Sequence, residues 1–168
     1  MPVRDGRDAY LAENGFTVDA YDSKWTEASF FGIRFRVPNP PRHRQAIMMH
    51  DLHHDATGYG TDLVGEAEIS AWEVRRGLRG VGAYVGAIVI AGATAGLVFA
   101  PRRTLRAWRA SRPGGSLFQT RRSYDELTSM TVGALRRELA VPQEGLADQP
   151  RRLHAYAAAA GVTSARRS

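Results

Sequence analysis

At 168 residues, 43% of them hydrophobic, the chain is long enough to bury a core, and its composition excludes wholesale disorder. It contains no cysteine, which excludes disulfides, thiolate catalysis and cysteine-ligated zinc sites. The formal net charge is +6, and nearly all of the positive charge is arginine, since Lys24 is the only lysine. No nucleic-acid-binding motif accompanies the arginines, so we expect a basic surface and no nucleic-acid partner.

The first 40 residues are expected to form a largely irregular N-terminal segment. Within it, residues 7–15 favour a short helix that ends at Gly15. Residues 33–37 alternate between apolar and polar side chains, as a short strand does, and Pro38 ends the alternation. The segment starts with no apolar signal region, which favours a cytoplasmic protein.

Two helices are predicted next. The first covers residues 41–56 and is broken by Gly58. Thr61 or Asp62 can cap the second, which runs to about Arg76. Because the connection is short, we expect the two helices to fold back on each other as an antiparallel hairpin.

Residues 80–100 contain no charged side chain, and Pro101 and two arginines follow them. A helix of this length just spans a hydrocarbon core of about 30 Å. We predict instead that it is the central apolar helix of the bundle, apolar on every side because it is buried on every side, with the membrane span as the alternative. The arginines that flank both ends give no clear orientation under the positive-inside rule.

The rest of the chain is also expected to be helical. Ser123 begins a capping box with Glu126, and Thr131 can cap a further helix. Residues 142–168 are expected to hold a last helix, over about 149–160, and a basic tail. The sequence therefore predicts one mainly α domain, a helical bundle with its core in residues 41–141.

The most chemically informative residues are His50, Asp51, His54 and Glu66. Successive helical residues turn by about 100°, so His50 and His54 lie about 40° apart and Asp51 falls within the same arc of about 100°. Glu66, near the start of the next helix, can reach that arc from across the hairpin. Imidazole and carboxylate groups both bind zinc and iron, so we predict a divalent metal site with an open position.

Spacing alone leaves one ligand open. His50, His53 and His54 also share an arc of about 100°, so either His53 or Asp51 can be the third group on the first helix. If Asp51 is not a ligand, it can orient one by accepting a hydrogen bond from its second ring nitrogen. A polar cluster held by hydrogen bonds alone is the remaining interpretation.

The pattern His50-Asp51-x-x-His54, eleven residues and then Glu66 resembles the signature of the Coq4 family of ubiquinone-biosynthesis proteins. The resemblance implies a helical fold and a divalent metal held by His50, Asp51, His54 and Glu66. It also implies loss of the carboxyl group at ring carbon 1 of a polyprenylated hydroxybenzoate, with hydroxylation at that carbon. The chain is shorter than typical members, so fold and site transfer better than substrate.

The partners follow from the same resemblance. It implies a polyprenylated aromatic or quinone-like lipid, peripheral membrane association and other biosynthetic enzymes. The arginine clusters separately favour an anionic membrane surface, and a homodimer is a further expectation. Two alternatives stay open at this stage. The chain can be a non-catalytic lipid-binding scaffold, or a single-pass membrane protein that spans the bilayer with residues 80–100.

Overall fold

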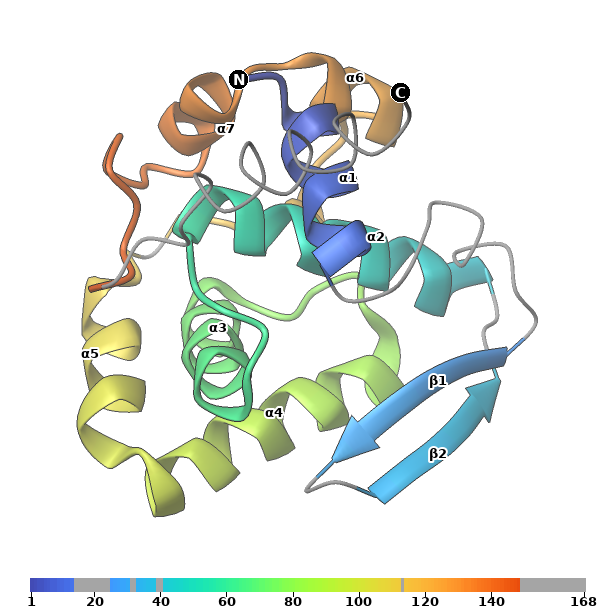
Figure 1. Cartoon of the computed structure of the whole chain (residues 1–168), viewed down its shortest axis with the longest axis vertical. Helices are drawn as coiled ribbons and strands as arrows, with labels where there is room; N and C mark the ends of the chain where they lie inside the picture. The colour runs from blue at the N-terminus through green and yellow to red at the C-terminus, as the bar shows by residue number, and fades with distance from the viewer. Residues whose placement is uncertain (14–24, 31–32, 39–40, 113, 149–168) are drawn as a thin grey trace, which may run out of the picture.

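A computed structural model describes residues 1–13, 25–30, 33–38, 41–112 and 114–148, and the described part is mainly helical, as predicted (Figure 1). The helices are α1 (Val3–Glu13), α2 (Pro41–Thr57), α3 (Leu63–Arg76), α4 (Gly82–Phe99), α5 (Pro101–Ala110), α6 (Tyr124–Ser129) and α7 (Val132–Glu138), with a 3-10 turn, η2, at Leu117–Gln119. Strands β1 (Trp25–Phe30) and β2 (Ile33–Pro38) pair antiparallel. The predicted helix over 149–160 lies outside the described residues.

The first 40 residues are more regular than expected. Helix α1 begins four residues before its predicted start, and the predicted strand has a partner in β1. Val3 is fully buried in the core, and its backbone N–H donates to the Met130 carbonyl at 2.8 Å. The start of the chain is therefore tied to the α6–α7 connection. The predicted helix end at Gly15 lies outside the described residues.

The core lies between α1, α2, α3 and the α6–α7 pair. Its largest fully buried apolar side chains are Trp72, Leu52, Ile69, Leu127 and Leu135. The predicted caps are present: Ser123 and Glu126 form a capping box, and Thr131 accepts from the Ala134 N–H. These caps satisfy N–H groups that short helices otherwise leave without partners.

Helices α2 and α3 have the predicted bounds to within a residue or two, but they do not form an antiparallel hairpin. Figure 1 shows α3 nearly end-on while α2 lies in the plane of the picture, so the two helices cross. Asp62 caps α3 by accepting from the Gly65 N–H at 2.6 Å. The connection folds tightly onto this first turn, since a Cβ at Gly65 would lie 2.1 Å from the Gly60 carbonyl oxygen. The direction of α3 is set by α4 and α5, which pack along it.

Helix α4 is apolar, but it is not the buried central helix that the sequence favoured. Its buried residues are Gly86, Val89 and Gly96; Gly96 meets Ala67 of α3, and Gly86 lies against Leu78 and Val81 of the α3–α4 connection. The remaining sides lie at the surface. By length and composition alone α4 is able to cross a membrane, and little of it is buried in the protein. An apolar sequence on every side therefore did not indicate burial on every side.

The glycines of α4 allow it to approach α3 closely. A Cβ at Gly96 would lie 2.5 Å from the Ala67 Cβ, and one at Gly92 would lie 2.6 Å from the Ser70 Oγ. Real Cβ atoms do not come this close, so Gly96 requires glycine while the helices keep this spacing, and a Cβ at Gly92 would require the Ser70 side chain to shift. These contacts pair the end of α4 with the start of α3, so the two helices run antiparallel.

Candidate metal centre

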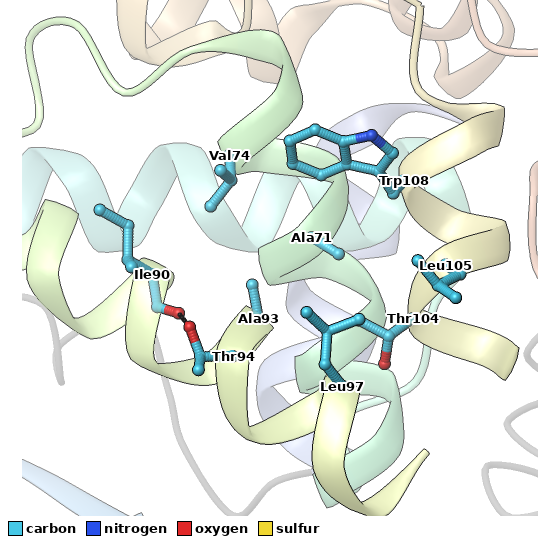
Figure 2. A pocket seen from close by; sticks show the side chains of 9 residues that line it. All are labelled: Ala71, Val74, Ile90, Ala93, Thr94, Leu97, Thr104, Leu105 and Trp108. Atoms are coloured by element: carbon cyan, nitrogen blue, oxygen red, sulfur yellow. Dashed lines mark hydrogen bonds between the residues drawn. The ribbon is translucent and has the colours of Figure 1, made fainter. Parts of the chain in front are cut away.

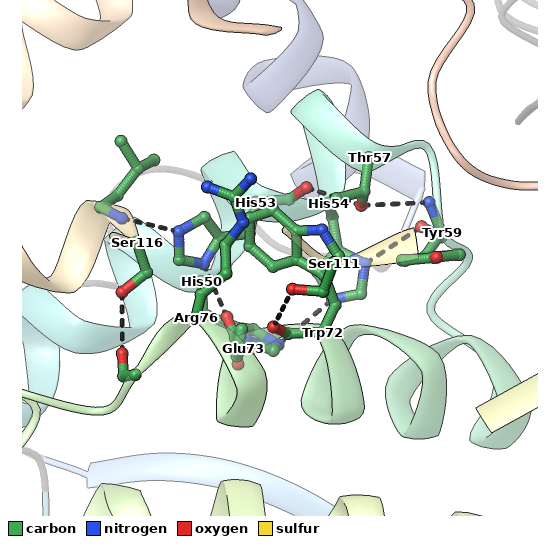
Figure 3. Close-up of polar contacts among 12 residues, drawn as sticks. His50, His53, His54, Thr57, Tyr59, Trp72, Glu73, Arg76, Ser111 and Ser116 are labelled. Carbon is green, nitrogen blue, oxygen red and sulfur yellow. Dashed lines mark hydrogen bonds and ion pairs between the residues drawn. The ribbon is translucent and has the colours of Figure 1, made fainter. Parts of the chain in front are cut away.

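Three histidines of α2 face α3, which supplies two carboxylates, from Glu66 and Glu73. His53, His54 and Glu73 are fully buried, whereas the side chain of His50 is 23% exposed and that of Glu66 is 41% exposed. Figure 3 shows the buried part of this cluster, with the histidines and Trp72 between α2 and α3. The cluster is thus closed at its base and open to solvent at Glu66.

His50, His54 and Glu66 bring one possible ligand atom each to within 4.8 Å of one another. The Nε2 atoms of His50 and His54 are 3.2 Å apart. Glu66 places Oε2 3.4 Å from His50 Nε2 and Oε1 3.4 Å from His54 Nε2. Zinc with bond lengths of about 2.0–2.1 Å and tetrahedral angles holds its ligand atoms roughly 3.3 Å apart. The three groups can therefore hold a metal ion with little rearrangement.

Hydrogen bonds fix which ring nitrogens face this point. His50 Nδ1 lies 2.9 Å from Glu73 Oε1, and His54 Nδ1 lies 3.0 Å from the Tyr59 carbonyl oxygen. A carboxylate and a carbonyl only accept, so both Nδ1 atoms carry the proton. In the neutral rings, the Nε2 lone pairs of His50 and His54 then face each other and Glu66. Histidines that bind metals commonly have this arrangement, with the second nitrogen donating to a carboxylate or carbonyl.

His53 is excluded as a ligand by its own hydrogen bonds. The Leu117 backbone N–H donates to His53 Nε2 at 2.9 Å, and His53 Nδ1 donates to Glu73 Oε1 at 2.7 Å. Both nitrogens are therefore occupied. The ring also packs edge-on against Trp72 and Phe118. Burial lowers the pKa of His53 and outweighs the opposing effect of Glu73, in keeping with a neutral ring.

The structure brings together three of the four predicted ligands. Asp51 is buried, with 5% of its surface exposed, but its carboxylate is not part of the group formed by His50, His54 and Glu66. In the helical projection Asp51 lies beyond His54, on the side opposite His53. Glu73 of α3 contacts α2 at His50 and His53, so α3 crosses α2 on the side away from Asp51. The role of Asp51 as a ligand stays a prediction from the resemblance.

Glu73 was not predicted as a site residue, yet one of its oxygens accepts from both His50 and His53. The sequence held a signal for it: Glu73 follows Glu66 by seven residues, about two helical turns, so both lie on the same side of α3. Its second oxygen, Oε2, is buried and has no hydrogen-bond partner among the described residues.

Opposite charges outweigh burial at three of the titratable groups. Burial alone would lower the pKa of His50, but Glu73 and Glu66 raise it well above 6.5. Burial would raise the pKa of Glu66, but His54 and His50 bring it far below its ordinary value. The pKa of Glu73 is likewise lowered, because His50 and His53 outweigh its burial. Both carboxylates are therefore ionised at neutral pH, and the centre attracts a cation.

The carboxyl end of α3 is anchored to the segment that positions Leu117. Ser111 Oγ donates to the Trp72 carbonyl and Ser116 Oγ to the Gly77 carbonyl, each at 3.0 Å. The guanidinium of Arg76 lies 4.4 Å from the centre of the Trp72 ring and donates to the Gly115 and Leu139 carbonyls. These bonds hold in place the segment whose Leu117 N–H donates to His53 Nε2.

Comparison of the chain with models of known protein families returns no match, and neither does comparison with curated proteins or with solved structures.

Proposed function

We propose that His50, His54 and Glu66 bind one divalent metal ion, zinc or iron, and that the chain is a metal-dependent enzyme for a quinone-like lipid. The convergence of two imidazole lone pairs and a carboxylate carries the proposal. In the metal-free protein the raised pKa of His50 keeps a proton on its Nε2, which lies 3.2 Å from His54 Nε2 and 3.4 Å from Glu66 Oε2, and a metal ion can take the place of this proton. A cation at this point satisfies all three groups.

The three ligands have different roles in the proposed centre. His54 is fully buried, and the Tyr59 carbonyl fixes its orientation, so it forms the rigid base of the centre. His50 is oriented by the fully buried Glu73, whose charge also makes the Nε2 atom of His50 a stronger metal ligand. Glu66 stands at the solvent-facing side, where a substrate oxygen can approach. A metal with three protein ligands keeps a position for substrate and, when bound, acts as a Lewis acid on a carboxylate or phenolate oxygen.

The lipid part of the proposal rests on the resemblance to the Coq4 family and on the apolar surface of α4. The resemblance favours a polyprenylated hydroxybenzoate and the removal of its ring carboxyl group, with hydroxylation at the same carbon. Biosynthetic-enzyme partners and a homodimer belong to the same proposal. So does a peripheral position on an anionic membrane, because a lipid substrate is reached from the bilayer.

A non-catalytic lipid-binding scaffold is the second candidate function. One observation favours it: the apolar surface of α4 lies on a different side of α3 from the histidines, so lipid contact does not require the metal centre. Lipid binding that survives complete loss of the metal, with no change in pathway activity, would support the scaffold over the enzyme.

The metal content of purified protein tests the proposed centre. We expect one zinc or iron ion per chain in the wild type, and its loss in His54→Ala and in Glu66→Ala. Asp51→Asn separates the two possible ligand sets: retained metal supports the three-residue centre, and lost metal supports Asp51 as a fourth ligand. Full metal content in both His54→Ala and Glu66→Ala would overturn the assignment. Circular dichroism of each variant checks that the fold is kept.

A further inference from the structure

Resting on the peripheral association proposed above, we propose that the exposed side of α4 and α5 docks onto an anionic lipid bilayer. Helix α4 then lies in the plane of the membrane surface and does not cross it. The docking surface is defined by apolar residues of α4 and α5 and by arginines at its edge. These residues are Tyr84, Ile88, Ile90, Leu97, Val98, Leu105 and Trp108, with Arg75, Arg102 and Arg109.

The apolar part of this surface is unusually exposed for a folded chain. Val98 is 82% exposed and Ile90 is 52% exposed, and no charged residue occurs between positions 80 and 100. Soluble monomers rarely leave contiguous apolar patches of more than a few hundred Å² in water, and larger ones mark interaction surfaces. Something apolar is therefore expected to cover α4.

A groove runs through the same surface. Figure 2 shows it between α4 and α5, with Ile90 and Leu97 on one side, Leu105 and Trp108 on the other, and Ala71 and Val74 contributed by α3. It has a volume of about 290 Å³, and its lining is almost entirely apolar. Filling such a groove with hydrocarbon is more favourable in free energy than filling it with water.

The arginines of α5 fall into two sets with different surroundings. Arg103 and Arg106 turn to the buried carboxylate of Glu68, which Arg103 contacts through two nitrogens at 2.6 and 3.0 Å. Arg102 and Arg109 are seven residues apart on the side next to Leu105, and both are exposed. Neither forms an ion pair with a described residue, so their charges are available to a ligand.

Arg75 extends this positive edge from α3. Its guanidinium lies 5.5 Å from the centre of the Trp108 ring, at one end of the groove. An apolar helix with arginines and a tryptophan along its border is typical of segments that lie in the membrane interface. The arginines then contact anionic headgroups while the apolar side chains enter the acyl region.

The packing of α4 favours an in-plane position over a membrane-spanning one. Helix α3 runs along α4 in close contact at Gly92 and Gly96, so both helices would have to enter the bilayer together. Glu68 and its arginine partners would enter with them, at a high cost in desolvation. A second copy is disfavoured as the occupant, because two such surfaces placed face to face bring like charges together.

Vesicle co-sedimentation of the full chain tests the surface. Wild type should bind vesicles that contain phosphatidylglycerol and bind phosphatidylcholine vesicles much more weakly, with binding that falls as salt is raised. Each arginine near an anionic surface contributes about fivefold in affinity, so Arg102→Glu/Arg109→Glu should weaken binding by more than about twentyfold. Val98→Asp should weaken it by more than about tenfold.

A matched control places the same charge change elsewhere. Arg121 and Arg137 are exposed near α6 and α7, at the other end of the molecule from α4 (Figure 1). Arg121→Glu/Arg137→Glu should bind clearly better than Arg102→Glu/Arg109→Glu. Equal binding by the two double variants would overturn the proposal. So would equal binding to both kinds of vesicle, or wild type that forms a dimer through α4 and ignores vesicles.

Two further measurements distinguish a failure of the docking surface from a failure of the metal centre. Alkaline carbonate should release the wild-type protein from membranes, and retention in the membrane would overturn the in-plane position. Arg102→Glu/Arg109→Glu should keep the metal content of the wild type, because neither arginine contacts the histidine cluster. Loss of docking with metal retained supports the surface, whatever the metal centre is shown to do.

Discussion

The two sides of helix α3 hold the molecule together in different ways. Toward α2, Glu66 and Glu73 make directional contacts with buried or half-buried histidines. Toward α4, Ala67 and Ser70 meet glycines at a distance that only small residues allow. The close packing of α3 against α4 therefore fixes the position of the helix whose opposite side carries Glu66 and Glu73. A polar centre with contacts of 3.2–3.4 Å needs such a rigid support.

Removing Glu73, the buried carboxylate on the side of α3 that faces α2, should have the largest effect on stability. Glu73→Ala leaves His50 and His53 without their shared acceptor in the interior, so we expect a loss of about 3–5 kcal/mol in the free energy of unfolding. Urea denaturation of the metal-free protein measures it. Glu138→Ala is the matched control: Glu138 forms an exposed pair with Arg122, and its removal should change stability by less than about 1 kcal/mol.

The milder variant Glu73→Gln separates positioning from stability. It keeps the shape of the side chain but removes the charge that orients His50, so metal affinity should fall about 10–100-fold in a folded protein. Competition with a chromogenic chelator measures the affinity. Unchanged affinity in a folded Glu73→Gln would show that Glu73 does not act on the centre.

Disturbing the close contact between α3 and α4 should have an intermediate effect on stability. In Gly96→Ala the new methyl would lie 2.5 Å from the Ala67 Cβ and 2.7 Å from the Thr104 Oγ1, so α4 must move. We expect a loss of about 1–3 kcal/mol in the free energy of unfolding. Because α4 supports the helix that carries Glu66, metal affinity should fall as well. Gly114→Ala is the control, because no atom lies within 4 Å of the added Cβ.

The pH dependence should show the smallest effect and should differ between metal-free and metal-loaded protein. The pKa of His50 is raised above 6.5, so its contribution to metal-free stability is complete below pH 6.5 and is lost as the pH rises through the raised pKa. Glu66 and Glu73 have lowered pKa values, so their contribution is present above pH 4.5 and is lost as the pH falls.

A bound metal requires neutral histidines, so its stabilising effect should grow with pH over the range in which the metal-free protein weakens. Thermal unfolding with and without added zinc, across this range, measures both trends. Metal-free protein that gains stability above pH 6.5, or a zinc effect that does not change with pH, would contradict the assigned charges.

The sequence predicted the helices around the centre well, because local chemistry determines their ends. Pro41, Gly58 and the cap at Asp62 mark the bounds of α2 and α3 closely. Three of the predicted ligands also converge, since His50 and His54 share one side of α2 and Glu66 follows a short connection. The exclusion of His53 was not predictable, because it depends on the backbone N–H of Leu117, 64 residues away.

The orientation of α3 and the exposure of α4 could not be read from the sequence. A short connection favours antiparallel helices, but here contacts of α3 with α4 and α5 determine its direction. Residues 80–100 are apolar on every side, so their pattern carries no information about which side is buried. The relationship to ubiquinone-biosynthesis proteins stays a prediction from the motif.

X-ray absorption at the edge of the bound metal tests the central claim most directly. A protein loaded with zinc or iron should show two imidazole rings and at least one oxygen in the coordination shell, and Glu73→Gln should leave the same ligands with weaker binding. A coordination shell without imidazole scattering, or one unchanged in His54→Ala, would contradict a centre formed by His50, His54 and Glu66.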